Sequence, residues 1–162
     1  MLWGGVTGYD MDDDFEALIA DIERKKHEEE RKIYSERALK EAYNPRNVGK
    51  LAEPSGSARV TGPCGDTMQI DIRVEAGRIS DCKFITDGCG ASIACGSVVT
   101  ELAKGERIEK ALEVTEKDVL RVLGGLPAEN VHCATLAVKT LRAAIGDYQC
   151  RLRNRSASEQ GS

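Results

Sequence analysis

The sequence predicts an α+β fold: a small three-stranded antiparallel sheet with helices packed on one face, preceded by a long N-terminal helix. Two observations predict it. Segments in which apolar and polar residues alternate with a period of two fall within residues 58–86, whereas the segments after residue 89 have helical periodicity. A chain whose strands come first and whose helices follow forms two layers, with the helices covering the sheet.

The composition is that of one ordinary domain with an appendage. The chain has 162 residues, a net charge of −4, 31% charged residues and 41% hydrophobic residues. It has no basic surface for nucleic acid and no apolar run long enough for a membrane. The first 22 residues lack a basic n-region and contain three consecutive aspartates, which argues against a signal or mitochondrial transit peptide. We therefore expect a cytoplasmic protein.

The N-terminal region predicts one helix from Asp12 to about Tyr43. Its first half carries a short apolar stripe at i, i+3, i+4 and i+7 spacing, and residues 23–32 are almost entirely charged, with opposite charges at i, i+4. Asn44-Pro45 ends the helix, because the residue before proline disfavours helical dihedrals. The stripe consists of Phe15, Leu18, Ile19 and Ile22.

Three strands follow. Met68, Ile70, Ile72 and Val74 alternate with polar residues, which indicates a strand with one buried face. Ala76-Gly77 predicts a tight turn, and residues 78–86 the returning strand of a hairpin. Residues 58–62 predict a shorter strand ahead of the turn that contains Cys64.

The remaining elements are helical. A helix begins after Cys89 and ends at Gly105, a short one covers 107–113, and another begins at Thr115 with a capping box to Asp118 and ends at Gly124. The last helix is predicted from His132 to Arg151. The expected organisation is an N-terminal extension, partly helical, at 1–32, a main domain at 33–150 and a disordered tail at 151–162.

The six cysteines are Cys64, Cys82, Cys89, Cys95, Cys133 and Cys150. In a cytosolic chain they are metal ligands, reactive thiols or buried small side chains, and no CxxC pair is present. Cys82 and Cys95 lie on apolar stripes and are predicted to pack in the core. Cys150 is predicted to face solvent.

The other three cysteines stand at turns or helix starts: Cys64 in TGPCGD, Cys89 in TDGCGAS and Cys133 in ENVHCATL. If these corners meet at one edge of the sheet, their thiolates form a soft ligand set suited to an iron–sulfur cluster or Zn²⁺. Asp66 and His132 each offer a further ligand, so the set is one cysteine short of a permanent cluster site. A helix N-terminus should also lower the pKa of Cys89 and Cys133.

These residues resemble a known family. YNPRNVGKL, GPCGDTMQIDIRV, KFITDGCGASIACGS and VHCATLAVKTLRAAIGDY are together similar to the IscU family, which is also found as the N-terminal domain of NifU. The resemblance implies a non-enzymatic scaffold for de novo assembly of a labile [2Fe–2S] cluster on Cys64, Cys89 and Cys133. Asp66 is the expected fourth ligand, because it shares a turn with Cys64, and His132 the alternative. We expect the His132 side chain to diverge from that of Cys133 by about 100° on the helix.

The resemblance also implies partners. Cys133 is the expected first acceptor of persulfide sulfur from a cysteine desulfurase, an electron-donating ferredoxin supplies electrons, and acceptor apoproteins receive the cluster. The sequence does not decide whether the protein forms a homodimer. When no cluster is bound, Zn²⁺ or Fe²⁺ is the alternative metal for the same site. The chain departs from the family in having LPAEN where members usually carry LPPVK, and Cys95 where they often have serine.

Two alternatives remain at this point. One is the zinc-dependent sulfur-acceptor branch of the same superfamily, which typically has an insertion between the second and third cysteines and lacks the histidine. The other is a structural or interaction module whose cysteines bind Zn²⁺ for stability. The compact spacing of Cys89 and Cys133, together with the presence of His132, favours the scaffold.

Overall fold

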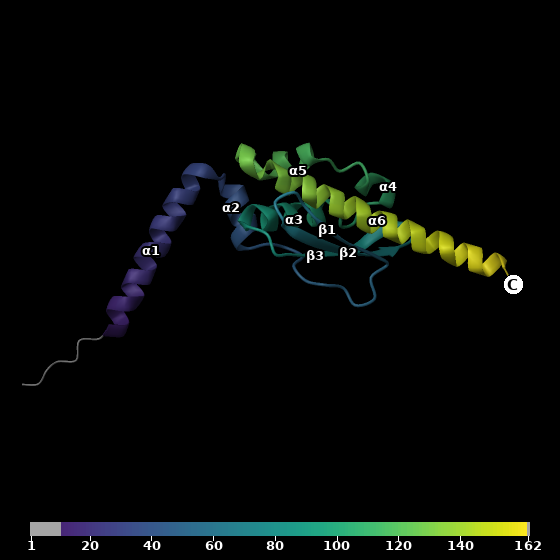
Figure 1. Cartoon of the computed structure of the whole chain (residues 1–162), viewed down its shortest axis with the longest axis horizontal. Coiled ribbons are helices and arrows are strands. Elements are labelled where there is room, and N and C mark those ends of the chain that lie inside the picture. Colours follow the sequence, from purple (N-terminus) through teal and green to yellow (C-terminus); the bar gives the residue numbers. More distant parts are fainter. Residues whose placement is uncertain (1–10, 162) are drawn as a thin grey trace, which may run out of the picture. The chain divides into compact units, whose positions relative to one another are not determined.

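The computed structural model describes residues 11–161, with side chains from residue 13 onward (Figure 1). The first ten residues of the N-terminal extension predicted at 1–32 lie outside this range. Within the described part, the chain forms one compact unit that ends at Ile33 and a second that begins at Tyr34. Each unit is described by itself below.

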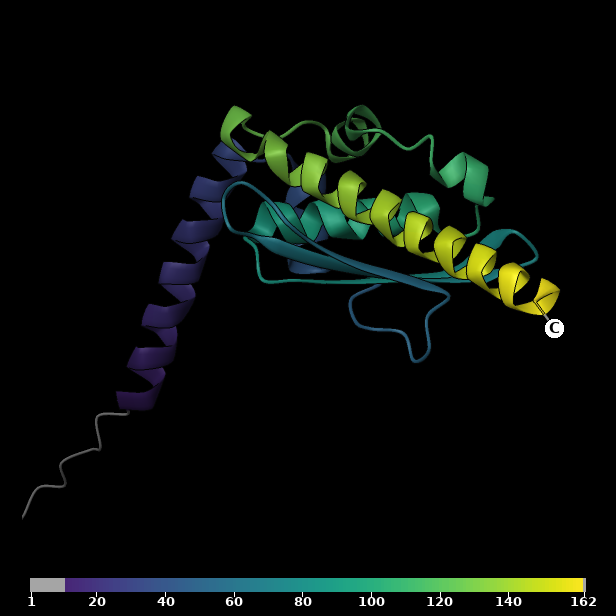
Figure 2. The same ribbon diagram turned by 45° about the vertical axis from the view of Figure 1, so that its right-hand side comes forward.

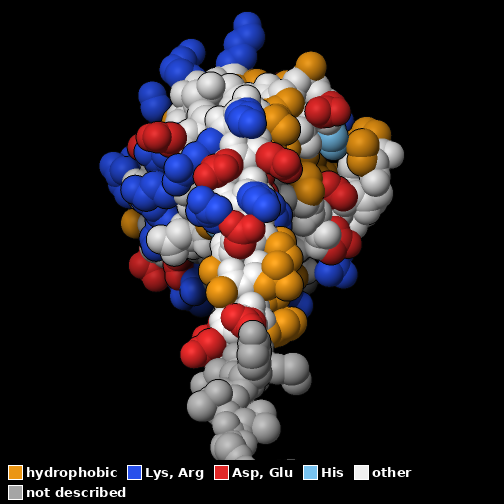
Figure 3. All heavy atoms as spheres, turned by 90° about the vertical axis from the view of Figure 1, so that its left-hand side faces the viewer, with side chains coloured by type: hydrophobic (Ala, Val, Ile, Leu, Met, Phe, Trp, Pro, Cys, Tyr) orange, Lys and Arg blue, Asp and Glu red, His pale blue; other side chains and the backbone are white. Residues whose placement is uncertain are grey.

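The first unit is helix α1 (Met11–Ile33), the long N-terminal helix that the sequence predicts. Its apolar stripe is exposed, with Phe15 at 64% and Leu18 at 55% of full exposure. In Figure 3, hydrophobic side chains gather near the N-terminal end of α1, and side chains of both charges follow further along the helix. Asp21 binds Lys25 at 3.0 Å and also pairs with Arg24, as expected for an exposed charged helix.

The prediction of one helix through Tyr43 is wrong, because the first helix ends at Ile33 and, after Tyr34-Ser35, a new helix begins, α2 (Glu36–Tyr43). Ser35 has extended dihedrals, and its hydroxyl accepts a hydrogen bond from the Ala38 N–H at 3.0 Å. A serine in this position is an N-cap, which begins a helix rather than continuing one. The same hydroxyl donates to the carbonyl of Leu123, the last residue of helix α5 (Glu116–Leu123), and so ties α2 to α5.

The sheet is three-stranded and antiparallel, as predicted, in the order β1-β2-β3. Its strands are β1 (Gly56–Thr61), β2 (Thr67–Glu75) and β3 (Arg78–Thr86). Ala76 and Gly77 both have positive φ, 51° and 76°, and form the tight hairpin turn between β2 and β3. Thr67 pairs with Thr61 on one side and Met68 with Thr86 on the other, so β1, β2 and β3 meet at the edge where the Cys64 turn lies.

The helices cover one face of the sheet (Figures 1 and 2). Helix α3 (Gly90–Ala103) packs against β3, and the long helix α6 (Val131–Gln160) packs against β1 and β2. Between them come α4 (Ile108–Ala111), α5 (Glu116–Leu123) and the short 3₁₀ helix η1 (Ala128–Asn130). The core lies in this interface and contains Met68, Ile70, Ile72, Phe84, Val99, Leu141 and Ile145.

Most predicted helix boundaries are confirmed. Gly105 has a positive φ of 86° just beyond α3. Both hydrogen bonds of the capping box between Thr115 and Asp118 are present, and Gly124 ends α5 in the left-handed region. These short-range signals succeed because capping depends on residues within one turn of each other.

The prediction of a disordered tail at residues 151–162 is wrong, because α6 (Val131–Gln160) continues as a helix through residue 160. The segment is exposed and has no glycine or proline before Gly161. Extending an existing helix requires no new nucleation, so arginine, leucine, alanine and glutamate prolong it without tertiary packing. None of the helices in the described part of the chain has the length and apolar character needed to cross a membrane.

Candidate metal centre

The first corner of the site is the turn between β1 and β2. The Gly62 N–H donates to the Asp66 carbonyl at 2.8 Å, and the Gly65 N–H donates to the Gly62 carbonyl at 3.0 Å. Gly65 has a positive φ of 86°, which suits glycine because it lacks a β-carbon. This tight turn leaves the thiol of Cys64 exposed, whereas the carboxylate of Asp66 is half-buried.

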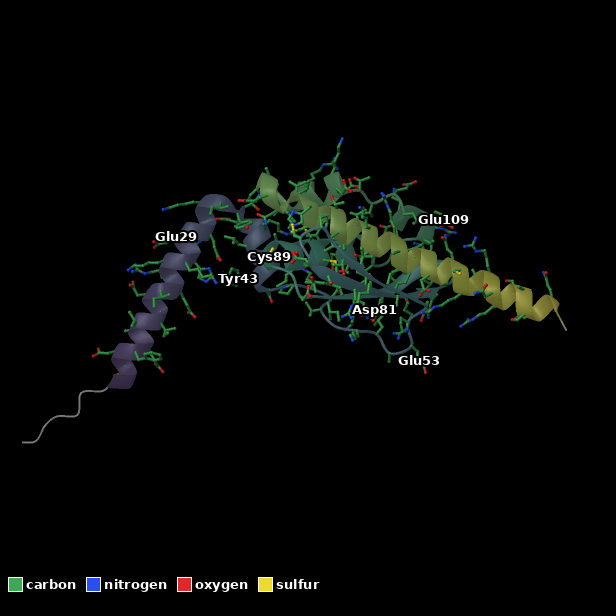
Figure 4. The ribbon with its side chains drawn as sticks, in the orientation of Figure 1. Glu29, Tyr43, Glu53, Asp81, Cys89 and Glu109 are labelled. Carbon is green, nitrogen blue, oxygen red and sulfur yellow. The ribbon has the colours of Figure 1, made fainter. Side chains whose placement is uncertain are left out.

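The second corner joins β3 to α3. Cys89 is the N-cap residue of α3, with extended dihedrals, and its thiol is exposed. In Figure 4, Cys89 lies at the end of the domain where α6 begins, far from Glu109 at the opposite end. The strand ends and helix starts therefore bring Cys89 to the same edge as the Cys64 turn.

The third corner is the first turn of α6, where His132 and Cys133 stand. Ligand atoms of Asp66, His132 and Cys133 all lie within 4.8 Å of one another. The His132 Nε2 atom is 3.7 Å from the Cys133 sulfur. The expectation that the His132 side chain diverges from that of Cys133 is therefore wrong, because the tip of the imidazole lies beside the sulfur. An oxygen, a nitrogen and a sulfur donor converge, which is a mixed set that suits Zn²⁺ or Fe²⁺.

One residue at the centre of these contacts was missed by the sequence analysis. Ser92, in the first turn of α3, is fully buried, and its hydroxyl lies 3.1 Å from Asp66 Oδ2 and 3.4 Å from the Cys133 sulfur. The Cys89 sulfur is 3.9 Å from the same hydroxyl. In the sequence Ser92 stands on the same helical stripe as the apolar Cys95 and Val99, and a serine at such a position was the available signal.

The protonation of Cys133 differs from the expectation. Cys133 is fully buried, and this burial raises its pKa to about 11, although the hydrogen bond from Ser92 acts in the opposite direction. The predicted lowering at a helix N-terminus is wrong for this residue, because desolvation of the thiolate outweighs the helix dipole. The raised pKa disfavours the thiolate form of Cys133 at neutral pH.

The other five cysteines differ in burial and in their distance from this group of donors. Cys89 reaches the converging group through Ser92, whereas the exposed Cys64 lies outside the three-residue group found among the described residues. Cys82 and Cys95 are fully buried in the core and Cys150 is exposed, as predicted. Burial raises the pKa of both core thiols, which makes them poor ligands as they stand.

Fold and site together define a class: a small α+β domain that presents cysteine, aspartate and histidine donors at one edge of its sheet. Residues 33–155 match the NifU-like N terminal domain family. The chain belongs to this family.

Two relatives and one solved structure illustrate the similarity. Iron-sulfur cluster assembly scaffold protein IscU 1 of Archaeoglobus fulgidus is 49% identical over 72% of this chain and 76% of its own length. The IscU scaffold protein of Aquifex aeolicus is 45% identical over 71% of this chain and 75% of its own. A crystal structure from Fervidobacterium islandicum, described as a scaffold protein for the SUF system, has a TM-score of 0.59 at 23% identity, covering 69% and 96% of the two chains. At that identity the structure supports the fold alone.

Proposed function

We propose that this protein is a scaffold on which a labile [2Fe–2S] cluster is assembled and from which the cluster passes to acceptor apoproteins. The observation that carries the proposal is the convergence of Asp66, His132 and Cys133 within 4.8 Å, with Cys89 beside them through Ser92. Membership of a family whose relatives are named as such scaffolds supports it. On this view the protein is not an enzyme, because it transfers iron and sulfur without catalysing the release of a product.

The proposed ligands are Cys64, Cys89 and Cys133, with Asp66 as the fourth and His132 as its alternative. A carboxylate is a harder and weaker ligand than a thiolate for iron in a sulfur-rich site, so it favours release of the cluster. The open turn around Gly65, where an added β-carbon would meet nothing within 4 Å, leaves room for Cys64 to approach a bound cluster.

The proposed sulfur source is a cysteine desulfurase. The thiolate of Cys133 attacks the outer sulfur of the desulfurase persulfide, the S–S bond breaks, and the desulfurase thiolate leaves, so that Cys133 carries the persulfide. Two electrons, delivered one at a time by a ferredoxin, then cleave the S–S bond of this persulfide, which releases the outer sulfur as sulfide and regenerates the Cys133 thiolate. Because Cys133 is buried and protonated in the metal-free protein, this step requires the site to open and the thiol to lose its proton.

All six cysteines are free thiols, which fits the reducing cytoplasm that we propose as the compartment. We propose docking of the desulfurase at the edge that holds the three cysteines, because its persulfide must reach Cys133. Cys64 and Cys89 are exposed and have glycine neighbours, so the surface beside them carries little side-chain bulk and allows such an approach.

The test is anaerobic reconstitution of the full chain with Fe²⁺, cysteine and a desulfurase, followed by absorption spectroscopy and analysis of iron and acid-labile sulfide. We expect a brown protein with equal iron and sulfide, and transfer of the cluster to an apo-ferredoxin. Replacing Cys64, Cys89 or Cys133 by serine should abolish a stable cluster, whereas Cys150→Ser should not. Iron binding without sulfide would contradict the proposal.

A second candidate is the zinc-dependent sulfur acceptor. The close spacing of the donors favours it, because ligands on a single tetrahedral Zn²⁺ stand about 3.3–3.8 Å apart, although members of that branch typically lack the histidine that is present here as His132. The two candidates differ in what the desulfurase reaction delivers. A zinc-loaded protein that accepts persulfide but never accumulates iron with sulfide would be the acceptor rather than the scaffold.

A further inference from the structure

We infer that Ser92 is a positioning residue of the metal centre, whose hydroxyl holds the carboxylate of Asp66 beside the sulfur of Cys133 and so sets the donor arrangement that receives the metal. The inference rests on the proposed function, because it names the residue that organises the proposed site. Ser92 contacts donors from all three corners: Asp66 from the β1–β2 turn, Cys89 from the β3–α3 corner and Cys133 from α6.

The hydrogen-bonding capacity of serine explains this role. A hydroxyl has one proton to donate and two lone pairs to accept with. In the metal-free protein the Ser92 hydroxyl donates to Asp66 Oδ2 at 3.1 Å, and its oxygen lies 3.4 Å from the Cys133 sulfur. The single hydroxyl proton can be donated to the Asp66 carboxylate or to the Cys133 sulfur, so Ser92 links these two donors in either orientation. Because Ser92 is fully buried, no solvent competes for these bonds.

Metal binding changes what this hydroxyl can do. A cysteine that ligates a metal has lost its proton and accepts hydrogen bonds only. Ser92 then faces two acceptors, the Asp66 carboxylate and the Cys133 sulfur, and can satisfy either by rotating its O–H bond. Hydrogen bonds to ligand sulfurs and carboxylates fix their orientation and tune the properties of the bound metal.

The packing around Ser92 supports a fixed position. An added β-carbon at Gly88 would lie 2.5 Å from the Ser92 hydroxyl oxygen and 2.9 Å from Asp66 Oδ2. The β3–α3 corner therefore closes directly over this pair of side chains. The hydroxyl orients the Asp66 carboxylate through the hydrogen bond of 3.1 Å that it donates beside this closely packed backbone.

The test uses Co²⁺, which substitutes for Zn²⁺ or Fe²⁺ and has absorption bands sensitive to its ligands. Ser92→Ala removes one oxygen atom at a position within a helix, where alanine is well tolerated. The matched control is Ser97→Ala, because Ser97 is also buried in α3 and donates to a carboxylate, Glu41, at 2.5 Å. Melting temperatures of both variants calibrate the structural effect of losing a buried hydroxyl.

We expect Ser92→Ala to bind Co²⁺ about ten-fold more weakly than the wild type, with altered charge-transfer and d–d bands. Ser97→Ala should keep the wild-type spectrum and affinity. In a double-mutant cycle, adding Ser92→Ala to Asp66→Ala should weaken Co²⁺ binding less than it does in the wild type, because Ser92 acts through Asp66. Equal affinity and equal spectra in the two serine variants, or full additivity with Asp66→Ala, would overturn the inference.

The Co²⁺ measurement separates this inference from the proposed function. If the wild type never holds iron with sulfide, the scaffold proposal fails whatever the serine variants do. If the wild type assembles a cluster while Ser92→Ala matches Ser97→Ala in Co²⁺ binding, the role of Ser92 fails alone.

Discussion

The backbone of Gly88 passes so close to Ser92 that a β-carbon at residue 88 would lie 2.6 Å from the Ser92 β-carbon and 2.5 Å from its hydroxyl oxygen. The two residues belong to the β3–α3 corner that carries Cys89. The absence of a side chain at residue 88 therefore determines how closely this corner approaches Asp66 and Cys133.

Gly88→Ala should disrupt the site. Its β-carbon would overlap Ser92 and would stand 2.9 Å from Asp66 Oδ2, so at least one donor must move. We expect Co²⁺ binding to weaken by about ten-fold or more, since displaced outer-shell partners typically have such effects. The matched control is Gly90→Ala, whose nearest neighbour would be the Ala42 β-carbon at 3.6 Å, an ordinary contact. Similar Co²⁺ affinities of the two variants would show that the corner can relax.

Alkylation of the metal-free protein should separate the cysteines by burial. Iodoacetamide should modify the exposed Cys64, Cys89 and Cys150 first, and Cys133 only slowly, because Cys133 is buried with a pKa raised to about 11. Iodoacetamide reacts with thiolate, whose fraction rises about ten-fold per pH unit below the pKa. Modification of Cys133 should therefore continue to accelerate up to about pH 11, above the point near pH 8.5 where a free thiol levels off. Peptide mass spectrometry against pH measures this, and early modification of Cys133 at pH 7 would contradict it.

Asp66→Ala should change cluster lifetime and transfer more than it changes folding. Removing the carboxylate takes away the weaker, harder ligand, so we expect slower transfer to an apo-ferredoxin and altered oxygen sensitivity. Asp66→Asn is the control for size, since it keeps the shape and loses the charge. Cluster spectra and transfer kinetics identical to those of the wild type would remove Asp66 from the mechanism.

Gly96→Ala should destabilise the domain without touching the site. A β-carbon at residue 96 would lie 2.4 Å from two ring carbons of the buried Phe84, so α3 would have to move away from β3. Overpacking of this kind typically costs about 1–3 kcal/mol in the free energy of unfolding. Gly146→Ala in α6, where a β-carbon meets nothing within 4 Å, should instead stabilise by about 0.5–1 kcal/mol. Urea titrations of both variants test the difference, and equal midpoints would contradict it.

Deletion of residues 1–32 should leave cluster binding intact while weakening self-association or the affinity for the desulfurase. The apolar stripe of α1 is exposed, and a helix of this length gains most of its stability from burying such a face. We therefore expect the stripe to bury against a partner surface. Sedimentation and calorimetry measure the two affinities, and a shortened chain unchanged in both would make the extension a solvated appendage.

Local patterns in the sequence predicted most of the secondary structure. The alternation from Met68 to Val74 and the Ala76-Gly77 turn predicted the β2–β3 hairpin, because strand periodicity and turn dihedrals depend on neighbouring residues. The break at Ser35 was missed, since a serine followed by a good helix former fits both a helix interior and an N-cap. Its role depends on the Leu123 carbonyl, to which its hydroxyl donates.

The sequence by itself determined the residue types of the site, which are cysteines at turns and helix starts. In two of the three corners a carboxylate or an imidazole stands close to the cysteine. Only the tertiary structure decided which of them meet. It brought Asp66, His132 and Cys133 together, left Cys64 exposed, and placed Ser92 between the donors. Burial also reversed the expected pKa shift of Cys133. Local sequence sets the chemistry that a side chain offers, whereas its solvation and its partners depend on segments far away in the chain.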